Sequence, residues 1–368
     1  MVVVVVGAGP VGLMLASELV RSGVRPVVLE ALPSPSVAPK ANGVVGLAVP
    51  LLYDRGLFPR RGPAPRFMYG GFPLDLRRLP DNPVYVQPVP QRSLESVLAS
   101  HAGVPVRRGH TVVGLRPASS GVTVSVSGPA GSYTIDASYV VGCDGAHSRV
   151  RKAAGIGFPG VSDSRVVSRS AHVSLPLSFR LGRHRPYLFH RTPHGVFSYA
   201  RFGRGPHLVT TLEWSSPVDS DAPVTLDEVR LSLGRVLGRS VRLGAPSGPG
   251  PHVLRRSTAR QNRIASSYVS GRVLLAGDAA HVVAGFGGPL LNLGLLDAVD
   301  LAPRLASNDV SGYDAARRPW AERVLASSAE QAALLSPGAE TDARRAEFAR
   351  YLATPSGLRR VASTIAGG

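Results

Sequence analysis

A run of β-branched residues followed at once by closely spaced glycines is the feature that most limits what this chain can fold into. Val2 to Val6 read as a strand buried on both faces, and Gly7-Ala8-Gly9-Pro10-Val11-Gly12 follows directly. The spacing predicts a tight turn, a backbone close to a pyrophosphate, and a helix packed against the strand. Unpaired N–H groups at the start of that helix favour a phosphate. The chain is therefore predicted to begin as a dinucleotide-binding α/β unit.

An acidic residue stands where the second strand of such a unit ends. After a predicted helix over residues 10–21, Val27 to Glu30 read as a strand that ends in Glu30. At this spacing a carboxylate accepts a hydrogen bond from a ribose 2′-hydroxyl and disfavours a 2′-phosphate. The two features predict an ADP-containing cofactor, and FAD and NAD both remain open.

After the nucleotide-binding unit, the sequence changes to predicted antiparallel strands and then returns to buried strand and helix. Residues 122–141 alternate around a Gly-Pro-Ala-Gly turn and predict a β-hairpin, and residues 165–214 are rich in predicted strands. Residues 224–237 predict a helix, residues 273–276 a buried strand, and the sequence after Leu290 is helical. This order predicts two domains made from discontinuous segments. We expect a nucleotide-binding domain of residues 1–72, 91–160 and 272–368, and a β-sheet domain of residues 73–90 and 161–271.

The charge and cysteine content of the chain indicate which kinds of binding partner to expect. The formal net charge is +18, but nearly every base is Arg, and the Arg residues are scattered without interleaved aromatics. This pattern indicates compositional bias rather than a nucleic-acid surface. The apolar start is too short to span a membrane, and a lone Cys143 fits a reducing compartment. We expect a cytoplasmic monomer or homodimer with a small-molecule substrate, no nucleic acid or membrane as a partner, and no metal site.

Two later segments choose between the cofactors. Residues 143–151 read Cys-Asp-Gly-Ala-His-Ser-Arg-Val-Arg after a predicted strand, and residues 272–281 are a strand that delivers Asp278 to a turn. With the glycine turn, they resemble the three motifs of the flavin-dependent aromatic hydroxylases of the p-hydroxybenzoate hydroxylase type. Residues 39–43 and 89–95 are also similar to this family, in particular to its branch that acts on aromatic polyketides.

The resemblance implies an α/β fold, in which a Rossmann-like FAD-binding domain carries a second β-sheet domain for the substrate. It implies an FAD-dependent monooxygenase that hydroxylates an aromatic, polyketide-type substrate with O₂ and with NADPH or NADH as a transient co-substrate. Two alternatives stay open. One is an enzyme that keeps FAD but catalyses a non-redox cyclisation or isomerisation, and the other is an inactive binding protein.

The resemblance also implies which residues contact the cofactor. They come from the glycine turn, the end of the second strand and the later motifs. The predicted contacts are Gly7, Gly9, Pro10, Val11, Gly12, Glu30, Ala31, Lys40, Gln91, Arg92, Asp144, Asp278, Gly287, Gly288, Leu291 and Asn292.

Some of these residues have a second interpretation. Asp278 is implied to hold the ribityl hydroxyls of FAD, but an acid at this turn is also typical of a helix N-cap. Asp144 is implied to lie near the pyrophosphate and to support nicotinamide use, with Ser148 and Arg151 beside it. Lys40 stands where the family usually has Arg, so the charge is kept while the bidentate geometry is lost.

The chain departs from the family in a glycine-rich turn that should approach the flavin. Leu290 stands where a glycine is usual, and further departures are Leu296, Asp300, Pro303 and Ala316. These departures concern reduction and oxygen activation more than FAD binding, and they motivate the non-redox alternative.

Four aromatic residues, three of them in the predicted β-sheet domain and one at its boundary, are the candidates for the substrate pocket. They are Phe72, Phe197, Tyr199 and Phe202, and ordinary core packing is the alternative for each. No catalytic side chain is assigned, because an electron-rich substrate phenol needs no obvious protein base.

Overall fold

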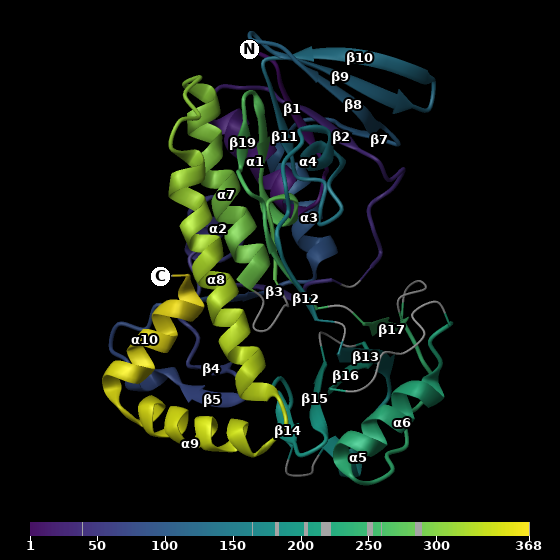
Figure 1. Cartoon of the computed structure of the whole chain (residues 1–368), viewed down its shortest axis with the longest axis vertical. Helices are drawn as coiled ribbons and strands as arrows, with labels where there is room; N and C mark the ends of the chain where they lie inside the picture. The colour runs from purple at the N-terminus through teal and green to yellow at the C-terminus, as the bar shows by residue number, and fades with distance from the viewer. Residues whose placement is uncertain are drawn as a thin grey trace.

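The computed structural model describes residues 1–38, 40–163, 165–180, 184–201, 205–214, 222–248, 253–258, 260–283 and 289–367. A six-stranded sheet in the order β19-β20-β11-β1-β2-β7 lies in the upper half of the molecule (Figure 1). All neighbours are parallel except the edge pair β19–β20. Its strands are β1 (Val3–Val6), β2 (Val27–Glu30), β7 (Val106–Arg108), β11 (Tyr139–Gly142), β19 (Val269–Ser270) and β20 (Val273–Leu275).

The β-branched strands of this sheet are buried because helices pack on them. Val3, Val4 and Val5 of β1 are fully buried, as a parallel sheet covered on both faces requires. Helix α1 contacts both α3 and α7, which are far apart in sequence. The main helices here are α1 (Pro10–Arg21), α3 (Gln91–Ala102) and α7 (Pro289–Ala306).

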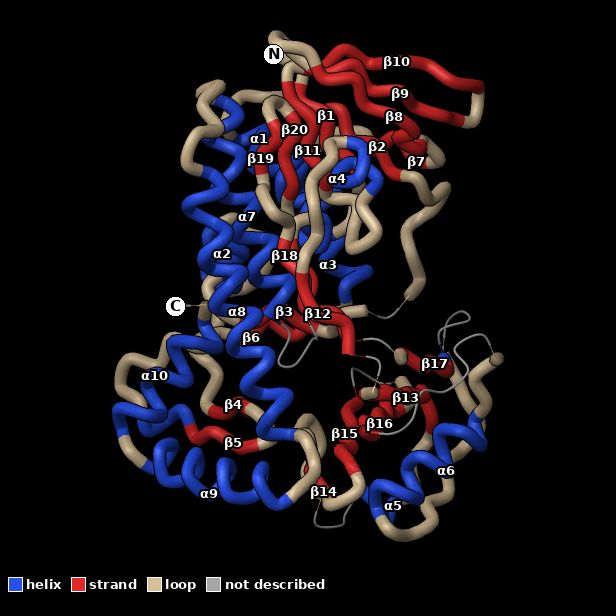
Figure 2. The backbone as a smooth tube through the Cα atoms, in the orientation of Figure 1, coloured by secondary structure: helices blue, strands red, loops and turns tan. Residues whose placement is uncertain are grey.

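An antiparallel sheet extends beyond this domain at the top of Figure 2. The predicted hairpin forms its edge strand β10 and its middle strand β9, and residues 139–142 pair with β1 in the six-stranded sheet. The strands are β8 (Thr111–Pro117), β9 (Val122–Gly128) and β10 (Gly131–Ala137).

The second half of the molecule is built on a five-stranded antiparallel sheet in the order β14-β15-β16-β13-β17. Its apolar residues pack against α6 (Leu226–Leu237) in a separate core cluster. The elements are β13 (Val166–Val173), β14 (His190–Thr192), β15 (Gly195–Arg201), β16 (His207–Trp214), β17 (Leu254–Ser257) and the short α5 (Leu177–Arg180). The chain then returns to the first sheet with β20, and the domain boundaries given above remain a prediction.

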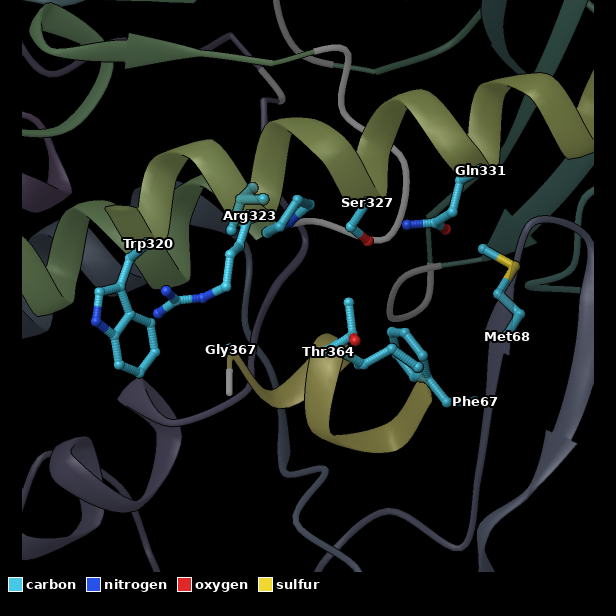
Figure 3. Close-up of a pocket in the computed structure, with 11 residues that line it drawn as sticks. Phe67, Met68, Trp320, Arg323, Ser327, Gln331, Thr364 and Gly367 are labelled. Carbon is cyan, nitrogen blue, oxygen red and sulfur yellow. The ribbon is translucent and has the colours of Figure 1, made fainter. Parts of the chain in front are cut away.

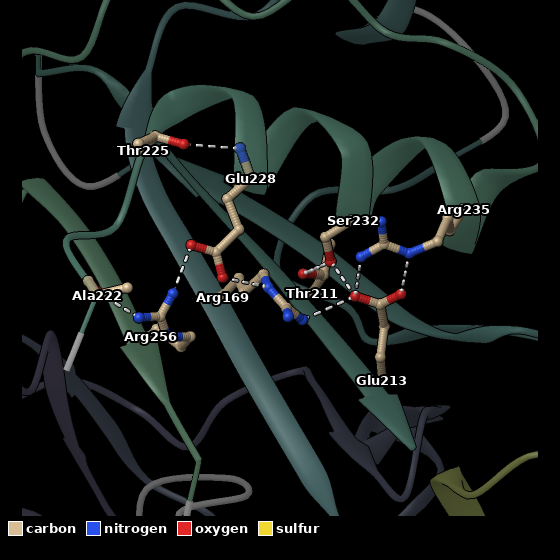
Figure 4. Close-up of polar contacts among 9 residues, drawn as sticks. All are labelled: Arg169, Thr211, Glu213, Ala222, Thr225, Glu228, Ser232, Arg235 and Arg256. Carbon is tan, nitrogen blue, oxygen red and sulfur yellow. Dashed lines mark hydrogen bonds and ion pairs between the residues drawn. The ribbon is translucent and has the colours of Figure 1, made fainter. Parts of the chain in front are cut away.

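A buried polar network fastens α6 to this sheet (Figure 4). Arg169 on β13 donates to Glu213 at 2.9 Å and to Glu228 at 2.8 Å. Arg235 and Ser232 on α6 also donate to Glu213. Burial alone raises the pKa of Glu213, but the hydrogen bonds from Arg235 and Ser232 outweigh it and the pKa is lowered. Burial also raises the pKa of Glu228, and the hydrogen bonds from Arg256 and Arg169 outweigh it, so this pKa is lowered too. The network therefore holds both carboxylates in their charged form.

Short sheets and C-terminal helices join the two halves. Arg191 on β14 donates to the carbonyl oxygen of Ser336 at 2.7 Å and pairs with Asp342, so the second sheet is tied to the end of α8 and to α9. The strands are β3 (Gly43–Val45), β4 (Arg66–Tyr69), β5 (Phe72–Asp75), β6 (Val86–Pro88), β12 (Gly160–Asp163), β18 (Arg260–Ile264) and β21 (His281–Val282). The helices are α2 (Ala48–Asp54), α4 (Arg149–Ala153), α8 (Tyr313–Leu335), α9 (Ala339–Ala353) and α10 (Pro355–Ala366), with 3₁₀ turns η1 (Leu76–Arg78) and η3 (Gly277–Ala279).

Candidate functional site

The glycine turn after β1 has one crowded side and one open side. Gly7 has φ +103°, and a Cβ atom there would lie 2.5 Å from the Cys143 carbonyl oxygen. A Cβ atom at Gly12 would lie 1.9 Å from the Gly7 carbonyl oxygen, so the turn must pack backbone on backbone. Around Gly9, by contrast, nothing lies within 4 Å of that position. No side chain caps the N-terminus of α1 there, so its N–H groups are left for a phosphate.

Gly9 opens on a cavity of about 1490 Å³. Its walls come from the glycine turn, from the ends of β2 and β11, from η3 and from the start of α7. They continue onto β4 and β5 and onto residues 185–188 of the second half. A site for one drug-sized ligand measures about 300–1000 Å³. The cavity therefore has room for a dinucleotide together with a second molecule.

Glu30 braces the glycine turn from the end of β2. Its Oε2 accepts a hydrogen bond from the Ala8 amide at 2.7 Å, and its Oε1 accepts one from the Leu32 amide at 2.9 Å. Each carboxylate oxygen has a further acceptor position. Because Glu30 lines the cavity, it can still accept a ribose hydroxyl.

The start of α3 adds a polar group to the same end of the cavity. Gln91 donates to Glu95 at 2.8 Å, and both line the cavity. Burial raises the pKa of Glu95, and Lys40 opposes that rise. Glu95 ends the 89–95 motif, but no role was assigned to it. Its position one turn after Gln91 was the available signal.

Asp144 lines the cavity but is already engaged. Its Oδ2 accepts from the amides of Arg149 at 2.7 Å and Val150 at 3.1 Å, and Ser148 donates to its Oδ1. Asp144 thus caps the first turn of α4. Beside it, buried Arg151 donates to the carbonyl oxygens of Ala146 at 3.0 Å and Ala279 at 2.9 Å, which ties this motif to the one around Asp278.

Asp278 faces the cavity from η3 and caps nothing. The N-cap of η3 is Ala276, with no side-chain cap, and within the described chain the Asp278 carboxylate makes no hydrogen bond. Its side chain is exposed to the cavity, yet protein atoms surround it closely enough that burial raises its pKa, against the effect of His281 and Lys40. An unsatisfied acceptor in a cavity wall fits a ligand that carries hydroxyl groups.

A buried charged group supports η3 from behind. Asp297 on α7 accepts from His281 Nε2 at 2.6 Å, from Arg317 Nε at 2.9 Å and from the Gly277 amide at 3.2 Å. Burial alone raises the pKa of Asp297, but His281 and Arg317 outweigh it and the pKa is lowered. Sequence reasoning missed Asp297 and Arg317. An acid inside an otherwise apolar helical stretch was the signal for the first.

Helices α1 and α7 meet at η3 through one side chain. A Cβ atom at Gly294 would lie 2.6 Å from Val11 Cγ2, and one at Gly277 would lie 2.9 Å from it. This close packing places Pro289, Leu290 and Leu291 at the start of α7 in the cavity wall.

The predicted cofactor contacts divide into three groups. Gly7, Gly9, Pro10, Val11, Glu30, Ala31, Lys40, Gln91, Asp144, Asp278 and Leu291 line the cavity. Gly12, Arg92 and Asn292 do not. Asn292 is buried, where its Oδ1 accepts from the Ala48 amide at 2.8 Å and so holds the start of α2. Gly287 and Gly288 fall outside the described residues.

The predicted substrate residues lie elsewhere. Phe197 and Tyr199 are 1% and 3% exposed and pack in the core beneath the second sheet. Phe72 packs on Phe348, with the Arg345 guanidinium 4.1 Å from its ring centre, and it does not line the cavity. Phe202 is outside the described residues. The corresponding walls come instead from Arg66, Phe67, Met68, Leu74, Arg185, Tyr187, Leu188 and Arg201.

A much smaller cavity adjoins the large one between α8, α10 and β4 (Figure 3). Trp320, Arg323, Ser327 and Gln331 line it from α8, and Phe67, Met68 and Pro289 belong to both cavities. Its volume of about 40 Å³ has room for about three water molecules. It is too small for an aromatic substrate.

A glycine turn of the dinucleotide-binding type, with a cavity that runs on to a separate antiparallel sheet, is the arrangement expected of the flavoprotein aromatic hydroxylases. A sequence model of the family described as FAD binding domain matches residues 1–328, and the chain belongs to this family. The predicted family and fold class are confirmed. No helix in the described part of the chain is long and apolar enough to cross a membrane.

Known proteins are similar to this chain in sequence and structure over nearly its whole length. The chain is 38% identical to a 12-dehydrotetracycline 5-monooxygenase/anhydrotetracycline 6-monooxygenase of Streptomyces rimosus, over 99% of this chain and 75% of that protein. The structure of an anhydrotetracycline hydroxylase from the same organism matches with a TM-score of 0.84 and 34% identity, over 100% of this chain and 76% of that one. A Diels-Alderase of pyrroindomycin biosynthesis matches with a TM-score of 0.88 and 29% identity, over 100% and 80%.

Proposed function

We propose that the chain is an FAD-dependent monooxygenase that hydroxylates an aromatic, polyketide-type substrate with O₂ and NADPH or NADH. The observation that carries the proposal is one cavity that begins at a phosphate-binding turn and ends on a second sheet. Gly9 and the start of α1 would hold the pyrophosphate, Glu30 the adenosine ribose, and Asp278 the ribityl hydroxyls. The tetracycline-modifying relatives support an aromatic polyketide as the substrate.

The chemistry of hydride acceptance and oxygen use would come from FAD itself. The protein supplies position and electrostatics. The N-terminus of α7 opens on the cavity at Pro289 and Leu290, and its N–H groups favour negative charge on a nearby ring. The group Asp297–His281–Arg317 fixes η3, so Asp278 is held toward the cavity while the opposite wall receives the substrate.

Three measurements on one purified protein test the proposal. The protein should bind FAD, with the visible absorption of an oxidised flavin. It should oxidise NADPH or NADH faster when a hydroxyanthraquinone is present, and mass spectrometry should find one ¹⁸O atom from ¹⁸O₂ in the product. A protein that binds FAD but neither reduces it nor incorporates ¹⁸O is not a monooxygenase.

A second candidate function is a non-redox cyclisation with FAD retained as a structural element. The similarity to a Diels-Alderase favours it, and so does Leu290 in the cavity wall where the family usually has glycine. Anaerobic stopped-flow mixing with NADPH separates the two candidates. The monooxygenase bleaches its flavin absorption when the aromatic compound is bound, whereas the cyclase stays oxidised.

A further inference from the structure

The two ends of the large cavity differ in charge. Its carboxylates, from Glu30, Glu95, Asp144 and Asp278, all belong to the nucleotide-binding end, where Lys40 and Arg108 are mixed among them. The end formed by β4 and the second sheet contributes Arg66, Arg185 and Arg201. Among the described residues that line this end, no side chain is acidic. The substrate end of the cavity is therefore a positive wall.

Within the part of the chain that the structure describes, two of these arginines form no ion pair with a carboxylate, although the Arg66 charge contributes to lowering the pKa of Asp75. Asp75 lies opposite Arg66 in the β4–β5 register, but Arg77 binds both its oxygens, at 2.7 Å and 2.6 Å. Neither Arg66 nor Arg185 forms an ion pair with any described residue. Both residues are exposed and line the cavity, so their positive charges are open to an anion that enters it.

The third arginine is brought to the same edge by a constrained loop. Tyr187 has φ +66°, a left-handed backbone that is uncommon for a tyrosine and persists only where neighbours hold it. Its amide donates to the Tyr199 carbonyl oxygen at 2.9 Å, and its hydroxyl donates to the Arg201 carbonyl oxygen. Residues 185–188 are thereby fixed against the end of β15, which keeps Arg185 and Arg201 on one wall.

We infer that the substrate carries an ionised acidic oxygen, which Arg66, Arg185 and Arg201 bind at the end of the cavity remote from the nucleotide cradle. This inference rests on the proposed function and specifies its substrate. Guanidinium groups suit a carboxylate or an ionised phenol or enol, because they donate several hydrogen bonds in one plane. The shared chemistry is an anionic oxygen attached to an aromatic polyketide skeleton.

The test compares 1,8-dihydroxyanthraquinone with its 3-carboxylic acid. Dissociation constants are measured by titration into the oxidised, FAD-loaded protein without nicotinamide. The variants are Arg66→Gln and Arg185→Gln, and Arg350→Gln on the exposed face of α9 is the control with the same loss of charge. We expect the acid to bind about tenfold more tightly than the parent compound, and each cavity variant to weaken the acid by about tenfold. The control should match the wild-type protein.

The absorption spectrum of bound 1,8-dihydroxyanthraquinone gives a second measurement. If this compound binds as its red-shifted anion, and loses that shift in the cavity variants, the acidic oxygen is phenolic and the inference also stands. Equal affinities for acid and parent compound without an anion spectrum would overturn it. Equal weakening of both compounds by the cavity variants, with no anion spectrum of the parent compound, would also overturn it, because that result reports a change of shape.

Two further results distinguish this inference from nicotinamide binding at the same arginines and from the proposed monooxygenase function. If the arginine variants bind the acid normally but need more NADPH for flavin reduction, the wall binds nicotinamide phosphates and the inference is wrong. If the wild-type protein binds the acid through these arginines but never hydroxylates it, the proposed function fails while the anion site stands.

Discussion

Gly9 and Gly12 are three residues apart, yet an added side chain would meet opposite surroundings. Gly9 has φ −72° and ψ −179°, which valine adopts readily, and the space beside it is open. We expect Gly9→Val to fold but to lose FAD binding, because its side chain fills the place of the pyrophosphate. Absorption of the purified variant and circular dichroism of its apoprotein check this.

Gly12→Ala is the matched comparison. Its methyl group would lie 1.9 Å from the Gly7 carbonyl oxygen, so the variant should be unstable even without cofactor. A yellow Gly9→Val protein, or a Gly12→Ala protein as stable as the parent, would show that the turn is placed differently.

Asp278→Asn should change FAD affinity and apoprotein stability in opposite directions. Loss of charge-assisted hydrogen bonds to the ribityl chain should weaken FAD binding by about 1–3 kcal/mol. Without FAD, the folded protein holds a carboxylate whose pKa burial has raised, so its ionised form costs stability at neutral pH. The variant apoprotein should therefore melt at a higher temperature than the parent at pH 7.

The pH dependence identifies the cause of that difference. The cost is present above the raised folded pKa of Asp278, and it disappears as the pH falls below the ordinary value of 3.8, where the carboxyl group is neutral in both states. Thermal melts of both apoproteins over this range measure it. Unchanged FAD affinity in the variant would remove Asp278 from the cofactor site.

The start of α7 is the element on which the choice of chemistry depends. Leu290 lines the cavity there, one residue after Pro289. We expect Leu290→Gly to destabilise the protein by about 1 kcal/mol, because glycine is a poor helix former. Flavin reduction should change little if the N–H groups of α7 already face the ring. A parent that stays oxidised under NADPH while Leu290→Gly is reduced would favour the non-redox candidate.

Arg169 is the buried arginine that joins Glu213 on β16 to Glu228 on α6. Arg169→Met would leave Glu213, which is 6% exposed, with one fewer positive partner and would remove a bond to Glu228. Breaking a buried pair costs about 3–5 kcal/mol when the remaining charge is left uncompensated. Because Arg235 still pairs with Glu213 and Arg256 with Glu228, the loss should fall below that range. Urea unfolding measures the loss, and Arg169→Lys should retain part of the stability. An unfolding midpoint equal to that of the parent would mean that the network adds nothing.

The stability that the Arg169–Glu213 network contributes should also depend on pH. Because the pKa of Glu213 is lowered in the folded state, its contribution is complete above the ordinary value of 4.5 and is lost as the pH falls through the folded pKa. Arg169→Met should therefore lose its remaining stability at a higher pH than the parent does.

Local signals explain which elements could be read from the sequence. The strand, turn and helix of residues 3–21 depend on neighbours in the chain, so the glycine spacing was enough to predict them. Asp278 could be placed because its motif is also local. Phe197 and Tyr199 are two residues apart, so they share one face of β15, but the sequence does not tell whether that face meets the cavity or α6. Arg66 and Arg185 come from segments more than a hundred residues apart, so only the fold brings them to one cavity.

Cofactor binding should stabilise the whole molecule, since the cavity draws its walls from both halves. FAD at about one hundred times its dissociation constant should add about 2.7 kcal/mol to the free energy of unfolding. Differential scanning calorimetry with and without FAD measures this gain. Gly9→Val, which blocks the cradle, should show no shift, and an equal shift in that variant would indicate that FAD binds elsewhere.

The contact of Val11 with both Gly277 and Gly294 has a consequence for gene shuffling. Residue 11 comes from the first segment of the chain and the two glycines from the last third, so a crossover between them exchanges one side of the contact without the other. A parent gene with a bulkier residue at position 11 would force its donated segment against these glycines. Productive chimeras should therefore inherit positions 11, 277 and 294 from the same parent, and recombination libraries can be designed with that linkage fixed.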